Sequence, residues 1–203
     1  MSDGYATLRR AIVEGELQPN QRLVEAELGA TYGLGRAAIR TAFVRLEQDG
    51  LVSREPHRGA RVRLVSEREA IEILEARAAL EGVAVRQAAQ RATQQDVGEL
   101  RAMLAEMRAL LDAGDLLAVS DANARLHRRL LEISGHGTAQ RLCAMLRSQI
   151  VRFQYRTILV PGRPERSFAE HTAVVDAVAE RDPERAERAL REHLAHVVEA
   201  LRR

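Results

Sequence analysis

Apolar side chains in the first 50 residues recur at the three- and four-residue spacing of amphipathic helices. Residues 5–15, 25–32 and 36–49 each show this pattern, and each stretch ends at or beside a glycine. Glycine after the last periodic position favours the left-handed backbone that ends many helices. The pattern therefore predicts three short helices in this part of the chain.

The period changes to two after residue 50. Residues 51–55 and 60–65 are short β-type runs on either side of Pro56-His57-Arg58-Gly59, and the second run alternates arginine with apolar residues. Such alternation is typical of a strand with one exposed face. Three helices followed by a two-stranded wing predict a winged helix-turn-helix domain over residues 1–65.

From residue 66 onward the helical period returns and replaces the strand pattern. The expected helices cover about residues 66–91, 94–113, 116–134, 138–160, 165–181 and 183–202. Short connections between amphipathic helices favour antiparallel packing. We therefore expect a mainly α protein whose second domain, residues 66–203, is an all-α antiparallel six-helix bundle.

The composition is that of a folded, helix-rich protein. Of the 203 residues, 46% are hydrophobic, 30% are charged and only 3% are aromatic, which suits an aliphatic core in helices. The single cysteine, Cys143, cannot form an intramolecular disulfide. No stretch approaches the roughly 18 apolar residues that a membrane span needs. These features predict a soluble cytoplasmic protein.

Positive charge is concentrated in the third helix and the wing. The formal net charge is only +2, yet residues 36–63 hold seven arginines against three acidic residues. Arg36 and Arg40 lie one turn apart at the start of the helix that enters the major groove in helix-turn-helix proteins, with Arg45 further along. Arginine can donate two hydrogen bonds to guanine, which predicts double-stranded DNA as the partner. The alternative is an ordinary solvated helix face.

The run LRRAIVEGELQPNQRLVEAELGATYGLGRAAIRTAFVRLEQDGLVSREPHRGARV resembles the N-terminal domain of the GntR family of bacterial regulators. This resemblance implies that Arg36, Arg40, Arg45, Arg58 and Gly59 contact operator DNA. It also implies a homodimer, because operators of helix-turn-helix dimers are two-fold symmetric.

Two positions depart from the family pattern. Asn20 replaces the usual glycine of a turn, and asparagine tolerates the left-handed backbone that such a turn needs. Gly35 replaces the usual serine or threonine before the third helix. We expect this change to remove a capping hydroxyl and a phosphate contact, which lowers operator affinity.

Three histidines of the second domain lie on apolar helix stripes. His127, His171 and His193 belong to three different predicted helices, and Asn123 precedes the first of them by one turn. A single histidine on such a stripe is most often a satisfied core residue. Three of them on helices of one bundle, with an amide oxygen nearby, favour convergence on a divalent transition metal.

The stretches EARAALEG, NARLHRRLLEISG and EHTAVVDAVAERDPERAERALREHL resemble the effector-binding FCD domain of the FadR subfamily of GntR regulators, in its six-helix VanR-like branch. The resemblance implies that Asn123, His127, His171 and His193 bind the metal, most often zinc or nickel. It further implies that a small organic acid fills the open metal positions and that Arg77 faces the cavity, where it could bind a carboxylate. An intrahelical salt bridge from Arg77 to Glu81 is an equally good interpretation.

These features favour a transcription regulator, most simply a repressor, whose operator affinity depends on a small carboxylate bound at or near the metal. Two alternatives stay open. The metal could be purely structural, or the three histidines could serve a metallohydrolase. The hydrolase reading lacks an evident general base or nucleophile motif in the sequence, and we therefore expect no enzymatic activity.

Overall fold

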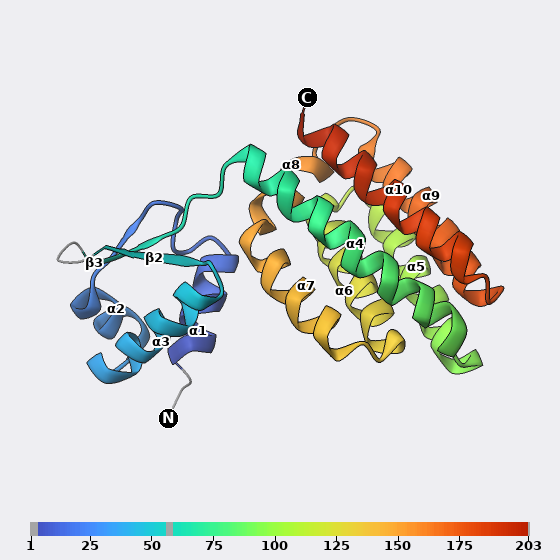
Figure 1. Ribbon diagram of the computed structural model, residues 1–203. Helices are drawn as coiled ribbons and strands as arrows, with labels where there is room; N and C mark the ends of the chain where they lie inside the picture. The colour runs from blue at the N-terminus through green and yellow to red at the C-terminus, as the bar shows by residue number, and fades with distance from the viewer. Residues whose placement is uncertain (1–3, 56–58, 203) are drawn as a thin grey trace. The chain divides into compact units, whose positions relative to one another are not determined.

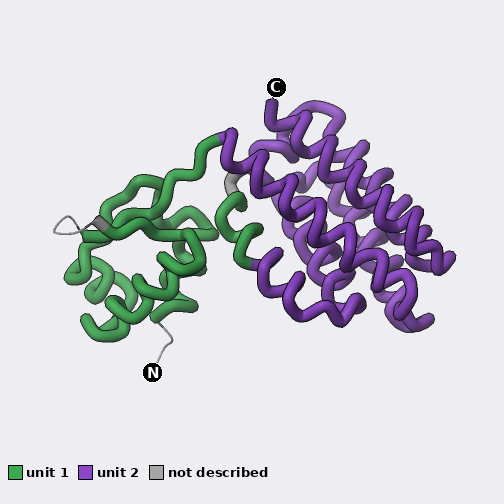
Figure 2. Tube along the Cα trace, in the orientation of Figure 1, with its two compact units in different colours: residues 1–66, 145–151 green, residues 67–144, 152–203 purple. Residues whose placement is uncertain are grey.

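The computed structural model describes residues 4–55 and 59–202, which form two compact units (Figures 1 and 2). The first unit comprises residues 1–66 together with residues 145–151, and the second comprises residues 67–144 and 152–203. The change of unit near residue 66 coincides with the start of the helix that begins at Glu67. Residues 145–151 belong to the first unit although the sequence predicted them within the helical domain.

The first unit is built from helices α1 to α3 and a small sheet. The helices are α1 (Gly4–Val13), α2 (Glu25–Tyr32) and α3 (Arg36–Gln48), and the strands are β1 (Arg22–Leu23), β2 (Val52–Glu55) and β3 (Gly59–Val62). Their buried side chains form one aliphatic core with the fully buried Leu8, Ile39 and Leu46 among its members. The winged helix-turn-helix predicted for this part of the chain is confirmed.

The wing has three strands in the order β1-β3-β2, where the sequence predicted two. Both neighbours of β3 run antiparallel to it, and Arg22 lies opposite Arg61 in the register of β1 with β3. Asn20, at the turn before β1, has a φ of 63° and donates its backbone N–H to Val62 O at 2.8 Å. The periodicity of the sequence missed β1 because two residues are too few to show alternation.

The second unit is an antiparallel helical bundle. Its helices are α4 (Glu67–Arg91), α5 (Gln94–Asp112), α6 (Leu116–Ser134), the first part of α7 (Gly137–Gln149), α8 (Val151–Ile158), α9 (Arg163–Ala179) and α10 (Pro183–Leu201). Helix α4 packs against α6 and α10, while α5 packs against α6 and α9. Valine, leucine and alanine side chains dominate the core between them. None of the described helices is long and apolar enough to cross a membrane.

The expected helix 138–160 is divided into α7 and α8 at Ile150, which is buried. Within the first unit, the Gln149 amide donates to Asp49 O at 2.9 Å and accepts from Arg63 Nη1 at 3.0 Å. These partners are distant in sequence, so helical periodicity could not reveal where α7 ends. The described part of the bundle therefore has one more helix than the six that were predicted.

Candidate metal centre and nucleic-acid interface

Three imidazoles meet in the interior of the second unit. His127 lies on α6, His171 on α9 and His193 on α10, and their exposed fractions are 3%, 0% and 1%. One ring nitrogen from each lies within 4.8 Å of the others. Two nitrogen ligands of one zinc ion lie roughly 3 to 4 Å apart, so small adjustments suffice for a shared metal.

A buried carboxylate on α4 orients the first imidazole. Glu81 Oε2 lies 2.5 Å from Nδ1 of His127, which leaves Nε2 of His127 only 3.1 Å from Nε2 of His171. Glu81 is itself paired with Arg77, whose Nε and Nη2 lie 2.8 and 2.7 Å from Oε1. A carboxylate on one ring nitrogen fixes the tautomer and directs the other nitrogen toward a metal.

A second carboxylate, that of Glu170 on α9, contacts and orients His193 in the same way. Glu170 Oε2 lies 2.7 Å from Nδ1 of His193 and 2.9 Å from Nη2 of Arg163. The third ring, His171, has Nδ1 3.4 Å from the Ser167 hydroxyl. Each imidazole therefore has a polar neighbour at Nδ1, and Nε2 is the nitrogen left to face the common point.

Burial favours the neutral, metal-binding form of two of these rings, His171 and His193. Desolvation lowers the pKa of His171 well below its usual range, and the charges of His193 and His127 lower it further. Desolvation also lowers the pKa of His193, although Glu170 opposes this effect. Burial acts to raise the pKa of Glu170, but the hydrogen bond and charge of His193, together with the charge of Arg163, outweigh it and lower that pKa. Neutral imidazoles beside an ionised carboxylate are suited to coordination.

Asn123, which the sequence predicted as a fourth ligand, carries a buried polar atom without a partner in the described part of the chain. Asn123 lies one turn before His127 on α6. Its Oδ1 is buried and has no hydrogen-bond partner among the described residues. A buried carbonyl oxygen without a partner is energetically costly in a finished structure. The three converging imidazole nitrogens are by themselves a donor set that fits a divalent transition metal.

The sequence located the histidines but not the acids that orient them. Glu81 was considered only as a partner of Arg77, and the structure contains that salt bridge. Glu170 was not singled out, because one carboxylate among many gives no periodic signal. Only its position directly before His171 and its side-chain contacts across the bundle reveal it.

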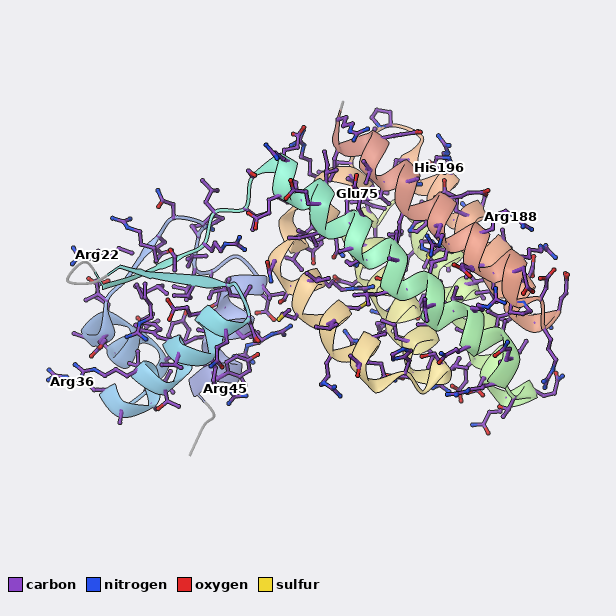
Figure 3. All side chains as sticks on the ribbon, in the orientation of Figure 1. Arg22, Arg36, Arg45, Glu75, Arg188 and His196 are labelled. Carbon is purple, nitrogen blue, oxygen red and sulfur yellow. The ribbon has the colours of Figure 1, made fainter. Side chains whose placement is uncertain are left out.

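In the first unit, α3 exposes basic side chains at its N-terminal end. Arg36 projects away from the unit in Figure 3 and is exposed, as is Arg40, whose Nε lies 2.9 and 3.1 Å from the two carboxylate oxygens of Glu25. Gly35 is the N-cap of α3 and provides no side-chain cap, as its identity predicted. The N-terminal amides of α3 are left for another acceptor, such as a phosphate.

The remaining candidate DNA contacts differ in setting. Arg45 stacks on Tyr5, with its guanidinium carbon 3.8 Å from the ring centroid, and Tyr5 donates to Asp49. Gly59 begins β3 with a φ of 85°, a backbone conformation that favours glycine. Arg58 lies outside the described residues. Arg22, which the sequence did not single out, is exposed on β1 and labelled in Figure 3.

Comparison with known proteins matches both units. Residues 3–62 match the family described as bacterial regulatory proteins, gntR family, and residues 72–196 match the FCD domain. The chain is 27% identical to the HTH-type transcriptional repressor RspR of Escherichia coli over 98% of this chain and 87% of that protein. It is 31% identical to a probable D-xylose utilization operon transcriptional repressor of Paenarthrobacter nicotinovorans, over 91% of this chain and 80% of that one.

Solved structures agree on the fold. The chain superimposes on E. coli McbR/YncC with a TM-score of 0.83 at 21% identity, covering 98% of this chain and 95% of that chain. The second family match alone spans more than half of the chain, and it adjoins the winged helix-turn-helix match in the order that the sequence predicted. The protein therefore belongs to the GntR family of bacterial transcription regulators, in the group that carries an FCD domain.

Proposed function

We propose that this protein is a cytoplasmic, homodimeric repressor that binds operator DNA and responds to a small carboxylate bound at a metal centre. The metal centre has the strongest support: three buried imidazoles whose Nδ1 atoms have polar neighbours and whose remaining nitrogens converge. The basic N-terminal end of α3 supports the DNA-binding role, and the names of the relatives support repression.

In this proposal α3 enters the major groove, where Arg36 and Arg40 reach base edges or phosphates. Arg40 would exchange its exposed pairing with Glu25 for DNA. Because that pair is exposed, releasing it costs little free energy. A homodimer places two such helices on the two halves of a palindromic operator.

In the second unit His127, His171 and His193 would hold the metal, with Asn123 as an oxygen ligand. When bound, zinc or nickel would supply open coordination positions for the carboxylate oxygens of an effector. Glu81 and Glu170 keep the imidazoles oriented. Because both carboxylates are held by imidazole and arginine partners, they are poorly placed to act as general bases, and we propose a non-enzymatic role.

The effector acts by linkage. A ligand that binds the DNA-free form more tightly than the DNA-bound form must weaken operator binding by the same factor. The test is a mobility-shift titration on an operator selected from random duplexes, with the zinc-loaded protein and a panel of small carboxylic acids. We expect at least one acid to weaken operator binding. A protein that ignores duplex DNA at low salt would contradict the proposal.

A purely structural metal is the second candidate, because the three rings are deeply buried. Chelation separates the two roles. If removal of the metal lowers thermal stability but leaves the response of operator binding to the acid intact, the metal is structural. If the response disappears while the protein stays folded, the metal belongs to the effector site.

A further inference from the structure

A separate pocket lies between the start of α9 and the last turns of α10. Its volume is about 220 Å³, and its charged or titratable lining residues are Arg163, Arg166, His196 and Glu199. His196 is labelled on α10 in Figure 3. All of these residues belong to the second unit, so the pocket is complete within one unit.

Three of the lining side chains contact the carboxylate of Glu170, which does not itself line the pocket. Glu170 Oε1 lies 3.2 Å from Arg166 Nε and 2.7 Å from His196 Nδ1, while Oε2 lies 2.9 Å from Arg163 Nη2. Two guanidinium groups therefore share a single carboxylate that also orients His193. Glu199 is an acid that lines the pocket, and it is exposed, so water screens its charge.

Arg163 carries an unused hydrogen-bond donor. Only 6% of the residue is exposed, and its Nη1 is buried without a hydrogen-bond partner in the described part of the chain. A buried guanidinium nitrogen without an acceptor is unfavourable, because it has lost its hydrogen bonds to water and gained none in return. Desolvation is the main cause that lowers the pKa of Arg163, with Glu170 opposing it. An acceptor from outside the chain would remove both penalties.

We propose that this pocket binds a small oxyanion, a carboxylate or a phosphate, through Arg163 with help from Arg166 and His196. The site is distinct from the proposed metal centre. Glu170 holds Nδ1 of His193, and Nδ1 and Nε2 point to opposite sides of an imidazole ring, so the pocket lies behind His193 as seen from the metal. This inference goes beyond the proposed effector site.

The shared carboxylate would connect the two sites. An anion on Arg163 and Arg166 shares the positive charge of these two guanidinium groups with Glu170 and so weakens their hold on its carboxylate. Glu170 would then rely more on His193 and His196, which strengthens its hold on the Nδ1 proton of His193. Occupation of the pocket would therefore alter the basicity of His193, one of the proposed metal ligands, through its hydrogen bond to Glu170.

The test is calorimetric titration of the full-length protein with inorganic phosphate and, separately, with succinate, each with and without a prior metal-chelation step. We expect saturable binding of at least one anion in both states, because the donors are side chains. The anion that binds more tightly identifies the source of the ligand. Arg163→Gln should weaken binding by about tenfold or more, since charge-assisted hydrogen bonds are the strong ones.

A second pocket provides the matched control. It lies on α4 and α10, has a volume of about 320 Å³ and is lined by three arginines and three glutamates, including Arg188 and Glu192. Arg188→Gln removes the same charge from the same unit and should leave anion binding unchanged. Equal weakening by Arg163→Gln and Arg188→Gln would overturn the proposal, as would the absence of saturable binding by the wild-type protein.

Two milder substitutions guard against misfolding. If circular dichroism shows that Arg163→Gln is unfolded, Arg166→Gln and His196→Asn decide, because both side chains are partly exposed. Each should weaken anion binding, and wild-type affinity in both would refute the site. If binding occurs only in the metal-loaded state, the anion binds the metal. The separate pocket is then wrong, while the proposed effector function stands.

Discussion

Arg77 on α4 is a buried cation whose guanidinium group pairs with the equally buried carboxylate of Glu81. The sequence allowed either an effector contact or a salt bridge with Glu81, and the structure contains the salt bridge with both groups almost fully buried. Glu81 in turn orients His127. Arg77 therefore stabilises the arrangement of the metal centre, whether or not it also reaches a ligand.

We expect Arg77→Ala to lower the free energy of unfolding by about 3 kcal/mol, because it leaves the buried Glu81 without its ionic partner. Urea denaturation measures the change. Arg86→Ala is the control, since Arg86 pairs with Glu184 and Glu187 at the surface and should cost less than about 1 kcal/mol. An Arg77 variant with wild-type stability and a lost acid response would favour the effector role.

A second prediction at the residue scale concerns the effect of the uncharged Asn123 on zinc affinity. Asn123→Asp adds a negative charge beside the proposed metal and should tighten zinc binding, whereas Asn123→Ala should weaken it by about tenfold. Competition with a chromophoric chelator measures both affinities. Asp121, an exposed neighbour on α6 whose carboxylate accepts from Tyr155, offers Asp121→Asn as a control. Unchanged affinity in Asn123→Ala would exclude this side chain as a ligand.

At the scale of elements, local signals placed most helix ends correctly. Thr93 caps α5 in a capping box with Asp96, and α10 begins at Pro183 after the capping Asp182. Both ends depend on residues within one turn, which the sequence displays directly. The division between α7 and α8 depends instead on Gln149 and its distant partners.

We expect Thr93→Ala to cost about 1 kcal/mol of unfolding free energy, because the Asp96 amide loses its capping hydroxyl. Thermal unfolding followed by circular dichroism measures the loss. Thr138→Ala is a suitable comparison, since the Thr138 hydroxyl accepts only a long, exposed bond from Arg141. Equal losses in both variants would contradict the capping role.

The carboxylate of Asp96, the partner of Thr93 in the capping box, makes the stability of the protein depend on pH. The Thr93 hydroxyl and backbone N–H, followed by Arg129, lower the pKa of Asp96. Its stabilising contribution is therefore full above the unfolded pKa of about 3.9 and is lost as the pH falls through the lower folded value. We expect the stability deficit of Asp96→Asn to be largest near neutral pH and to shrink in acid.

A further prediction concerns α3, the helix proposed to enter the major groove. Arg36→Ala should weaken operator binding by about tenfold and, if Arg36 contacts a phosphate, reduce the salt slope by about one. Fluorescence anisotropy at several salt concentrations measures both quantities. Arg10→Ala is the control, because Arg10 is an exposed arginine of α1 near Glu14. A constant loss of affinity at every salt concentration would point instead to a base contact.

At the scale of the whole molecule, DNA binding and ligand binding lie in different compact units. The three histidines proposed to bind the metal all belong to the second unit, whose α6, α9 and α10 must be packed before the imidazoles can meet. Metal binding should therefore favour the folded bundle over the unfolded chain, as any ligand of the native state does.

Zinc at about 100 times its dissociation constant should raise the unfolding free energy by about 2.7 kcal/mol. Differential scanning calorimetry measures the accompanying rise of the melting temperature. His171→Ala should abolish this rise, whereas His136→Ala should preserve it, because His136 lies in the turn before α7. A zinc response that survives in His171→Ala would place the metal elsewhere.

The sequence by itself determined the class of each unit, most helix ends, and the three histidines, because periodicity, capping and turn chemistry act over a few residues. It also indicated the GntR and FCD relationship, which the comparisons confirmed. Only the tertiary structure decided that a ring nitrogen of each histidine lies close to the other two, that Glu81 and Glu170 contact His127 and His193, and that Arg163 has an unpartnered donor among the described residues. These features depend on contacts between helices far apart in the chain, which no local pattern records.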